Sequence, residues 1–316
     1  MPSDDFLNVL HKVGETSALI VHIVDIFDFE GSFILGLKRF IGQNPVILVV
    51  NKMDLLPKDI NYNRMINWVQ RRTKELGLRV MDVVLVSAKT NIGLDRLIAS
   101  LGKHGADRDI YIVGATNVGK SSLVNRLIRN YSDLAEEITI SQYTGTTLDL
   151  ISIPLEGGKN IIDTPGIVYK HRLTEIMPRS NLDALIPQKM LKPIVYQLDE
   201  EQTLFFGGFA RFDFVHGEHQ SFSCYLSNSI QVHRTKLERA DELFASHWGE
   251  LLSPPNKEDL PKVPRWTRHS LRISRGDQAD IVISGLGWIR VNRDIGAEVD
   301  VYAPKGVKVI VRRALI

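Results

Sequence analysis

A glycine-rich loop in the middle of the chain constrains the fold more than any other feature. Residues 114–121 read Gly-Ala-Thr-Asn-Val-Gly-Lys-Ser, which matches the pattern G-x-x-x-x-G-K-[ST]. An apolar run precedes this loop, and a helix-period segment at residues 120–130 follows it. A strand, a loop and a helix in this order place backbone N–H groups around a phosphate at the N-terminus of the helix. The loop therefore predicts a nucleoside-triphosphate site in an α/β domain.

Short β-branched runs alternate with helical stretches through the first 170 residues, which is typical of an α/β domain with a largely parallel sheet. The expected strands are residues 18–25, 46–50, 83–86, 109–113, 148–153 and 160–162, and helices include residues 63–76 and 120–130. Prolines punctuate residues 171–205, and the pattern then changes to Phe-rich strand-like runs. These are residues 204–215, 221–232, 270–275, 280–291 and 298–313, with one helix at 236–248. We expect a nucleotide-binding domain over residues 1–190 and a smaller, mostly antiparallel α+β domain over residues 191–316.

The nucleotide base is indicated by a second motif. Asn51-Lys52-Met53-Asp54 follows a fully apolar strand and matches N-K-x-D. A carboxylate at Asp54 can accept hydrogen bonds from guanine N1–H and the 2-amino group, and adenine would leave this carboxylate unpaired. The stem of Lys52 is expected to pack along the base. Ser87-Ala88-Lys89 follows another strand and resembles the S-A-K motif, in which the Ala88 N–H donates to guanine O6. Together these motifs predict a guanine nucleotide.

Metal and switch residues are expected on both sides of the phosphate loop. Lys120 is predicted to neutralise the β- and γ-phosphates, and Ser121 to bind Mg²⁺. Asp163-Thr-Pro-Gly166 matches D-x-x-G, so Asp163 is expected to hold Mg²⁺ through a water and the Gly166 N–H to contact the γ-phosphate. Thr147 is the expected switch ligand to Mg²⁺ and the γ-phosphate, with Thr146 as the alternative. The full predicted set of nucleotide-contacting residues is Asn51, Lys52, Asp54, Ser87, Ala88, Lys89, Gly114, Thr116, Asn117, Val118, Gly119, Lys120, Ser121, Ser122, Thr146, Thr147, Asp163 and Gly166.

The order of these motifs is rearranged. Conventional GTPases read P-loop, switch Thr, D-x-x-G, N-K-x-D and S-A-K, whereas this chain places N-K-x-D and S-A-K before the P-loop. This order resembles the circularly permuted GTPases, most closely the YqeH group, over roughly residues 18–170. The resemblance implies a circularly permuted Ras-like P-loop GTPase domain, and a role in assembly of the small (30S) ribosomal subunit through contact with 16S-type rRNA. At position 144 this chain has Thr, where the permuted family often has Pro.

Hydrolysis is expected to be slow without help. Ras-like proteins carry a water-orienting Gln after the D-x-x-G glycine, and this chain has Ile167 there. Potassium-activated GTPases of similar motif pattern carry an Asn in the P-loop that helps to hold K⁺. Asn117 occupies that position, so stimulation by K⁺ or by a partner is predicted, with Lys120, Thr147, Gly166 and Asn117 as the catalytic set. The alternative is that Asn117 only shapes the loop.

Composition limits the metal sites and the cellular locations that we expect for this chain. The chain has 316 residues, a net charge of +2 and one cysteine, Cys224. The YqeH group usually carries a four-cysteine zinc finger ahead of the GTPase domain, and a single cysteine predicts no Cys-based zinc site in this chain. No apolar run is long enough to cross a bilayer and no signal-peptide pattern is present. We expect a cytoplasmic, monomeric protein without a membrane partner.

The C-terminal segment of the chain is basic. Residues 262–316 contain 11 Lys and Arg against 5 Asp and Glu. This excess suggests contact with rRNA through Arg265, Arg268, Arg272, Arg275, Arg312 and Arg313, or else a solvated sheet face. The Phe-rich strands are expected to fill a core. Two other functions stay open on the sequence alone: a GTPase without a ribosomal role, and an RNA-binding protein whose nucleotide site is only structural.

Overall fold

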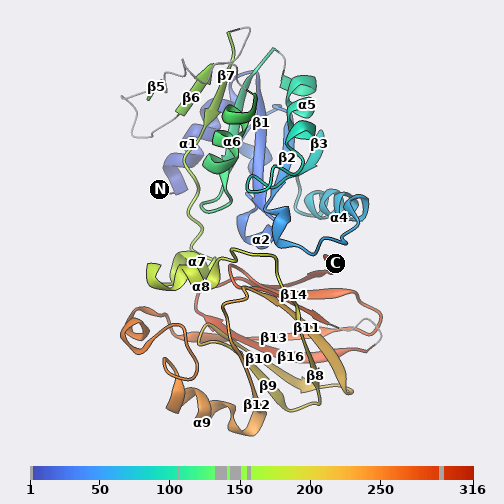
Figure 1. The fold of residues 1–316 in the computed structure, drawn as a ribbon, viewed down its shortest axis with the longest axis vertical. Coiled ribbons are helices and arrows are strands. Elements are labelled where there is room, and N and C mark those ends of the chain that lie inside the picture. The colour runs from blue at the N-terminus through green and yellow to red at the C-terminus, as the bar shows by residue number, and fades with distance from the viewer. Residues whose placement is uncertain (1–2, 106, 132–140, 143–150, 155–157, 292–294) are drawn as a thin grey trace. The chain divides into compact units, whose positions relative to one another are not determined.

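The structure is a computed structural model that describes residues 3–316 except 106, 132–140, 143–150, 155–157 and 292–294. The chain divides into two compact units, Met1–Tyr169 and Lys170–Ile316 (Figure 1). The expected domain boundary at residue 190 lies inside the second unit. The predicted switch residues Thr146 and Thr147, and the variant position Thr144, lie outside the described residues.

The first unit is built around a mixed sheet whose order is β3-β2-β1-β4-β7-β6-β5. Its strands are β1 (Ala18–Asp25), β2 (Val46–Asn51), β3 (Asp82–Leu85), β4 (Asp109–Gly114), β5 (Ser141–Gln142), β6 (Ile151–Pro154) and β7 (Asn160–Asp163). The pairs β3/β2, β2/β1, β1/β4 and β4/β7 are parallel, while β6 runs antiparallel to β7 and β5. The predicted parallel α/β domain is therefore confirmed.

Helices cover this sheet (Figure 1). The helical segments of the first unit are α1 (Ser3–Gly14), α2 (Phe29–Ser32), α3 (Leu37–Phe40), η1 (Met53–Leu55), α4 (Tyr62–Glu75), α5 (Leu94–Gly105) and α6 (Lys120–Tyr131). The strands β1 and β2 are buried along their whole length. This burial explains their continuous apolar sequence, because helices flank a parallel sheet on both faces.

The second unit holds two five-stranded antiparallel sheets, with orders β12-β9-β10-β16-β13 and β17-β14-β15-β11-β8. The strands are β8 (Ile194–Leu198), β9 (Gln202–Phe206), β10 (Ala210–His216), β11 (Gln220–Leu226), β12 (Val232–Lys236), β13 (Trp266–Ile273), β14 (Ala279–Ile283), β15 (Gly287–Val291), β16 (Ala297–Pro304) and β17 (Val309–Arg313). Its helical segments are α7 (Leu173–Ile176), η2 (Arg179–Asn181), α8 (Leu182–Leu185), α9 (Leu237–His247) and η3 (Lys257–Lys262). One hydrophobic core joins the two sheets.

The Phe-rich strands form that core, as expected. Phe206, Phe209, Phe212, Phe214 and Phe222 are fully buried, so none of them can stack on a base in the folded protein. Two predicted strands are in fact hairpins. Residues 204–215 turn at Gly207, which has φ +52°, and residues 280–291 turn before Gly287.

Candidate functional site

The predicted nucleotide motifs meet at one edge of the first unit's sheet. β2 ends at Asn51, β4 at Gly114 and β7 at Asp163, and β3 ends two residues before Ser87. These strands are mutually parallel, so their carboxyl ends share one edge. Ligands of open α/β sheets bind at this edge. The permuted chain therefore brings the P-loop, the two guanine motifs and the D-x-x-G motif together.

The P-loop adopts a conformation that its sequence explains. Asn117 has φ +62° and Gly119 has φ +87°, both in the left-handed region that Asn and Gly tolerate best. Asn117 is exposed, whereas Val118 is buried. A Cβ on Gly114 would lie 2.7 Å from the carbonyl oxygen of Ile23, so the loop start must be glycine. The backbone is thus shaped to curl before α6 begins at Lys120.

Asn51 connects the guanine motif to the P-loop. Its Nδ2 donates to the Val118 carbonyl oxygen over 2.9 Å, and its Oδ1 accepts from the Ala88 N–H over 3.1 Å. A Cβ on Gly119 would lie 2.5 Å from Asn51 Nδ2. One buried amide therefore joins three predicted motifs. The Ala88 N–H, expected to bind guanine O6, is bonded to Asn51 in this structure.

The remaining guanine residues are held by a second set of hydrogen bonds. Ser87 Oγ donates to Asp54 Oδ1 over 2.6 Å and accepts from the Thr90 N–H over 3.1 Å. Arg126, on α6, donates from Nε to the Ala88 carbonyl oxygen over 3.1 Å. These bonds hold the loop after β3 against the guanine motif on one side and against α6 on the other. Arg126 was not predicted, and its position one helix turn beyond Ser122 gave no motif signal.

Lys120 and Asp163 are the buried charges of the site, with exposed fractions of 8% and 6%. Burial lowers the pKa of Lys120, and the Asp163 carboxylate counters this only in part. Burial likewise raises the pKa of Asp163 against the opposing effects of Lys120 and Ser121. Burial therefore disfavours the charged form of both side chains. A negatively charged phosphate would favour the charged form of Lys120.

The donors next to Lys120 fit a hard divalent cation. Asp163 Oδ1 is buried and has no hydrogen-bond partner among the described residues. Ser121 Oγ lies 3.5 Å from the other oxygen, Asp163 Oδ2. Carboxylate and hydroxyl oxygens are the ligands that Mg²⁺ prefers. The described part of the Mg²⁺ set therefore fits the ion.

The D-x-x-G loop rests directly on the P-loop. Thr164 donates from its amide and from Oγ1 to the Ile112 carbonyl oxygen, over 3.2 and 2.8 Å. The Ile167 N–H donates to the Gly114 carbonyl oxygen over 3.1 Å, and the Thr116 N–H donates to the Ile167 carbonyl oxygen over 2.8 Å. A Cβ on Gly166 would lie 3.2 Å from Thr116 Cα and 3.3 Å from Lys120 Nζ. Gly166 is therefore placed against the phosphate loop, and Ile167 is buried.

The second unit corrects part of the predicted basic surface. Arg312 is 3% exposed and pairs with the buried Asp280 at 3.3 Å, so its assignment to rRNA contact was wrong. Arg268 is exposed but pairs with Asp300 over 2.6 Å, and Arg272 pairs with Glu298 over 3.5 Å. Charge counting cannot distinguish these paired residues from exposed, unneutralised ones.

No helix in the described part of the chain combines the length and the apolar character needed to cross a membrane.

Two family models match parts of the chain. One, described as "50S ribosome-binding GTPase", matches residues 109–204, and the other, described as "YqeH-like, C-terminal", matches residues 219–315. The first covers the P-loop and the D-x-x-G motif. The second covers most of the second unit's sheets.

Similar proteins include bacterial and plant sequences. The chain is 49% identical to "Uncharacterized protein YqeH" of Bacillus subtilis over 316 residues, which is 100% of this chain and 86% of that protein. It is 30% identical to "NO-associated protein 1, chloroplastic/mitochondrial" of Arabidopsis thaliana over 99% of this chain, but spans only 64% of that relative. A solved structure, "Crystal structure of GNP-bound YlqF from T. maritima", is 16% identical, with a TM-score of 0.36 over 58% of this chain and 72% of that one. A TM-score this low supports no inference about this chain.

Proposed function

The chain belongs to the YqeH family of GTPases, and from that membership we propose that it is a GTP-hydrolysing switch that acts in the cytoplasm in assembly of the small ribosomal subunit. The observation that carries the proposal is the Asn51 amide, which bonds the P-loop and the loop after β3. This link couples the phosphate site to the guanine site. A switch requires such coupling, because loss of a phosphate must change how the whole site holds the nucleotide.

Each charged residue of the site has a proposed task. Lys120 neutralises the β- and γ-phosphates, and Asp54 accepts hydrogen bonds from the guanine base. Ser121 and Asp163 hold Mg²⁺, the latter through a water, together with Thr147 or Thr146. When bound, Mg²⁺ neutralises charge that develops on the phosphate oxygens. Gly166, packed against Thr116, donates its N–H to the γ-phosphate and senses its loss.

Intrinsic hydrolysis is proposed to be slow. Ile167 is 3% exposed, and its backbone N–H and carbonyl are bonded to the P-loop. An apolar, buried side chain cannot orient an attacking water. Some other group must therefore supply positive charge or position the water.

We propose that K⁺, held by Asn117, supplies this charge. The exposed side chain of Asn117 is free to face a bound nucleotide, although its φ of +62° alone would also favour Asn at this position. Asn117→Gly separates the two explanations, since glycine tolerates the same φ but removes the amide. Single-turnover rates should be higher in KCl than in NaCl for the wild type and nearly equal for the variant. Equal wild-type rates in the two salts would exclude the role of K⁺.

Ribosome binding is tested by co-sedimentation of the full chain with isolated 30S and 50S subunits, in GTP, a non-hydrolysable GTP analogue or GDP. We expect nucleotide-dependent binding to 30S particles. The matching family description names the 50S subunit instead, so preferential binding to 50S particles would overturn the small-subunit assignment. Absence of binding to either particle in every nucleotide state would leave a GTPase without a ribosomal role.

A further inference from the structure

Asp25 is a buried carboxylate at the nucleotide edge of the sheet that no motif explains. It is the last residue of β1 and lies opposite Asn51 in the parallel register of β1 and β2. The next residue along the chain, Ile26, donates its N–H to the Asn51 carbonyl oxygen over 3.1 Å. Asp25 therefore stands directly beside the start of the guanine motif. It is 3% exposed.

The Asp25 carboxylate is fixed at both oxygens. Oδ1 accepts from the Phe27 N–H over 2.9 Å, and Oδ2 lies 2.6 Å from Lys52 Nζ. The Asp25 N–H in turn donates to Ser32 Oγ over 3.0 Å. The carboxylate thus belongs to a hydrogen-bonded turn, and of its two contacts among the described residues, that with Lys52 reaches into the guanine motif.

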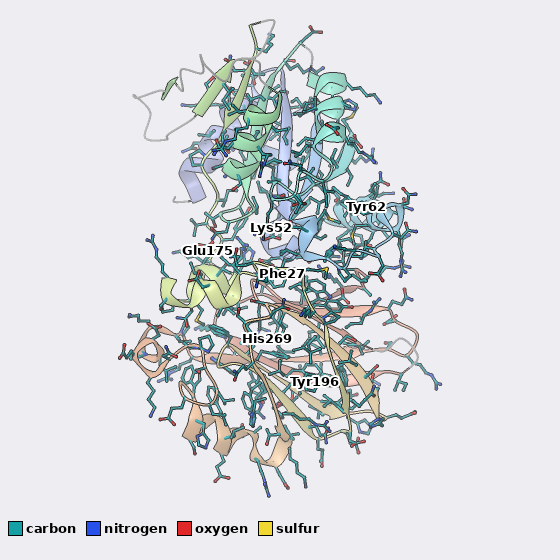
Figure 2. The ribbon with its side chains drawn as sticks, viewed as in Figure 1. Phe27, Lys52, Tyr62, Glu175, Tyr196 and His269 are labelled. Atoms are coloured by element: carbon teal, nitrogen blue, oxygen red, sulfur yellow. The ribbon has the colours of Figure 1, made fainter. Side chains whose placement is uncertain are left out.

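Asp25 contacts the end of the Lys52 side chain. The Lys52 backbone has φ +67°, and its side chain is 21% exposed while the Asp25 side chain is 4% exposed. The lysine is labelled in Figure 2. A lysine side chain has a large rotamer entropy, which is lost when it is ordered on a ligand. A partner that orders it in the free protein removes part of that cost.

We infer that Asp25 is a positioning residue that holds the Lys52 stem in place for the guanine base. This inference rests on the proposed function, because it concerns the guanine site of that same GTPase. Among the described residues, Asp25 has no hydrogen bond or ion pair with the P-loop, Ser121 or Asp163. Its effect should therefore appear in binding of the nucleotide and not in the chemical step.

The test compares Asp25→Asn with the wild type. Asparagine keeps an oxygen for the Phe27 N–H but removes the charge that pairs with Lys52. We expect the Kd for GDP and the KM for GTP to rise about tenfold, the effect of losing one charge-assisted hydrogen bond, with kcat unchanged. A merely structural role would instead reduce the active fraction, and so lower the apparent kcat at an unchanged KM.

Lysine variants provide a second, independent measurement. Lys52→Met keeps the stem and removes the ammonium, so it should weaken GDP binding about as much as Asp25→Asn does. The double variant should be no weaker than either single variant, because both remove the same interaction. Asp82→Asn, which removes a carboxylate bonded to Ser100 and remote from Lys52, is the matched control and should bind GDP like the wild type.

Three results would overturn the inference, and they are distinct from failure of the proposed function. If the wild type binds GDP tightly and Asp25→Asn binds it equally well, Asp25 does not position Lys52. Additive losses in the double variant would also contradict the inference. If Asp25→Asn does not fold, Lys52→Met decides the question, and GDP binding by Lys52→Met as tight as that of the wild type would contradict the inference. A wild type that neither binds GDP nor hydrolyses GTP would instead refute the proposed function itself.

Discussion

Two clusters of buried charge, one in each unit, differ in how completely they are paired. In the first unit, the buried Lys120 and Asp163 form no ion pair with each other, and Asp163 Oδ1 lacks a hydrogen-bond partner among the described residues. In the second unit, Arg211 bonds Asp213 over 2.7 Å and also pairs with Asp241, while Thr203 donates to Asp213. Incompletely paired charges at the carboxyl ends of parallel strands indicate a ligand site, because a ligand can supply the missing partner. The fully paired cluster indicates a structural role.

Breaking the paired cluster should have the largest effect on stability. Asp213→Ala leaves the Arg211 guanidinium, 6% exposed, without its main buried partner. The free energy of unfolding should fall by about 3 kcal/mol, since removing one member of a buried pair leaves an uncompensated charge. Urea unfolding measures the change.

A matched variant shows whether the loss comes from the orphaned charge. Replacing both members, Arg211→Met with Asp213→Leu, should cost less than Asp213→Ala alone, because no buried charge then remains. If Asp213→Ala unfolds like the wild type, the cluster contributes nothing and the comparison between the units fails.

The contact between the P-loop and the guanine motif should have an intermediate effect. Gly119→Ala places a Cβ 2.5 Å from Asn51 Nδ2 at a φ of +87°. Gly77→Ala is the control, with a similar φ of +80° and no atom within 4 Å of the new Cβ. Both variants incur the strain of a left-handed alanine, about 1 kcal/mol. Gly119→Ala should lose about 1–2 kcal/mol more, through the displaced Asn51.

Nucleotide binding sharpens that comparison. GDP affinity should drop in Gly119→Ala and stay unchanged in Gly77→Ala, because only the first variant disturbs the site. Equal unfolding free energies for the two variants, with equal GDP affinities, would show that the Asn51 link does not organise the site.

The smallest change in stability is expected for Asp163→Asn. Burial raises the pKa of Asp163 above its unfolded value, so the folded state binds the proton more tightly than the unfolded state. The ionised carboxylate therefore lowers stability as the pH rises from the unfolded pKa through the folded one. Asparagine removes this pH dependence, while the loss of attraction to Lys120 offsets part of the gain. The free energy of unfolding at pH 7 should change by less than about 1 kcal/mol.

GTP hydrolysis should respond far more strongly than stability to the same substitution. Mg²⁺-dependent GTP hydrolysis should be lost in Asp163→Asn although the fold is retained, as is common where a site is built from desolvated charges. Thermal unfolding at pH 4 to 8 and turnover assays with and without Mg²⁺ measure the two effects. A loss of stability as large as that of Asp213→Ala would mean that Asp163 is a structural residue.

The convergence of the nucleotide motifs at one sheet edge was easier to predict from the sequence than the hairpins of the second unit, for physical reasons. The motifs follow buried parallel strands, and the edge where such strands end is a consequence of topology. The hairpin at Gly207 was missed although Gly207-Gly208 is a turn signal, because the apolar pattern of its two buried strands continues directly on both sides of the turn. The charge of Arg312 is visible in the sequence, but its pairing with Asp280 depends on strand register. Asp25 escaped notice for the same reason, since only the register of β1 and β2 sets it beside Lys52's motif.

The central claim, that the permuted motifs form one working GTP site, is tested most directly by single-turnover hydrolysis of GTP by the wild type and by Lys120→Ala, with Mg²⁺ and K⁺ present. Lys103→Ala is the control, because Lys103 is an exposed lysine on α5. The wild type and Lys103→Ala should hydrolyse GTP at the same rate, and Lys120→Ala should be slower by a factor on the order of one hundred or more, as expected when a preorganised charge on the transferring phosphate is removed. Hydrolysis by Lys120→Ala at the wild-type rate would contradict the account.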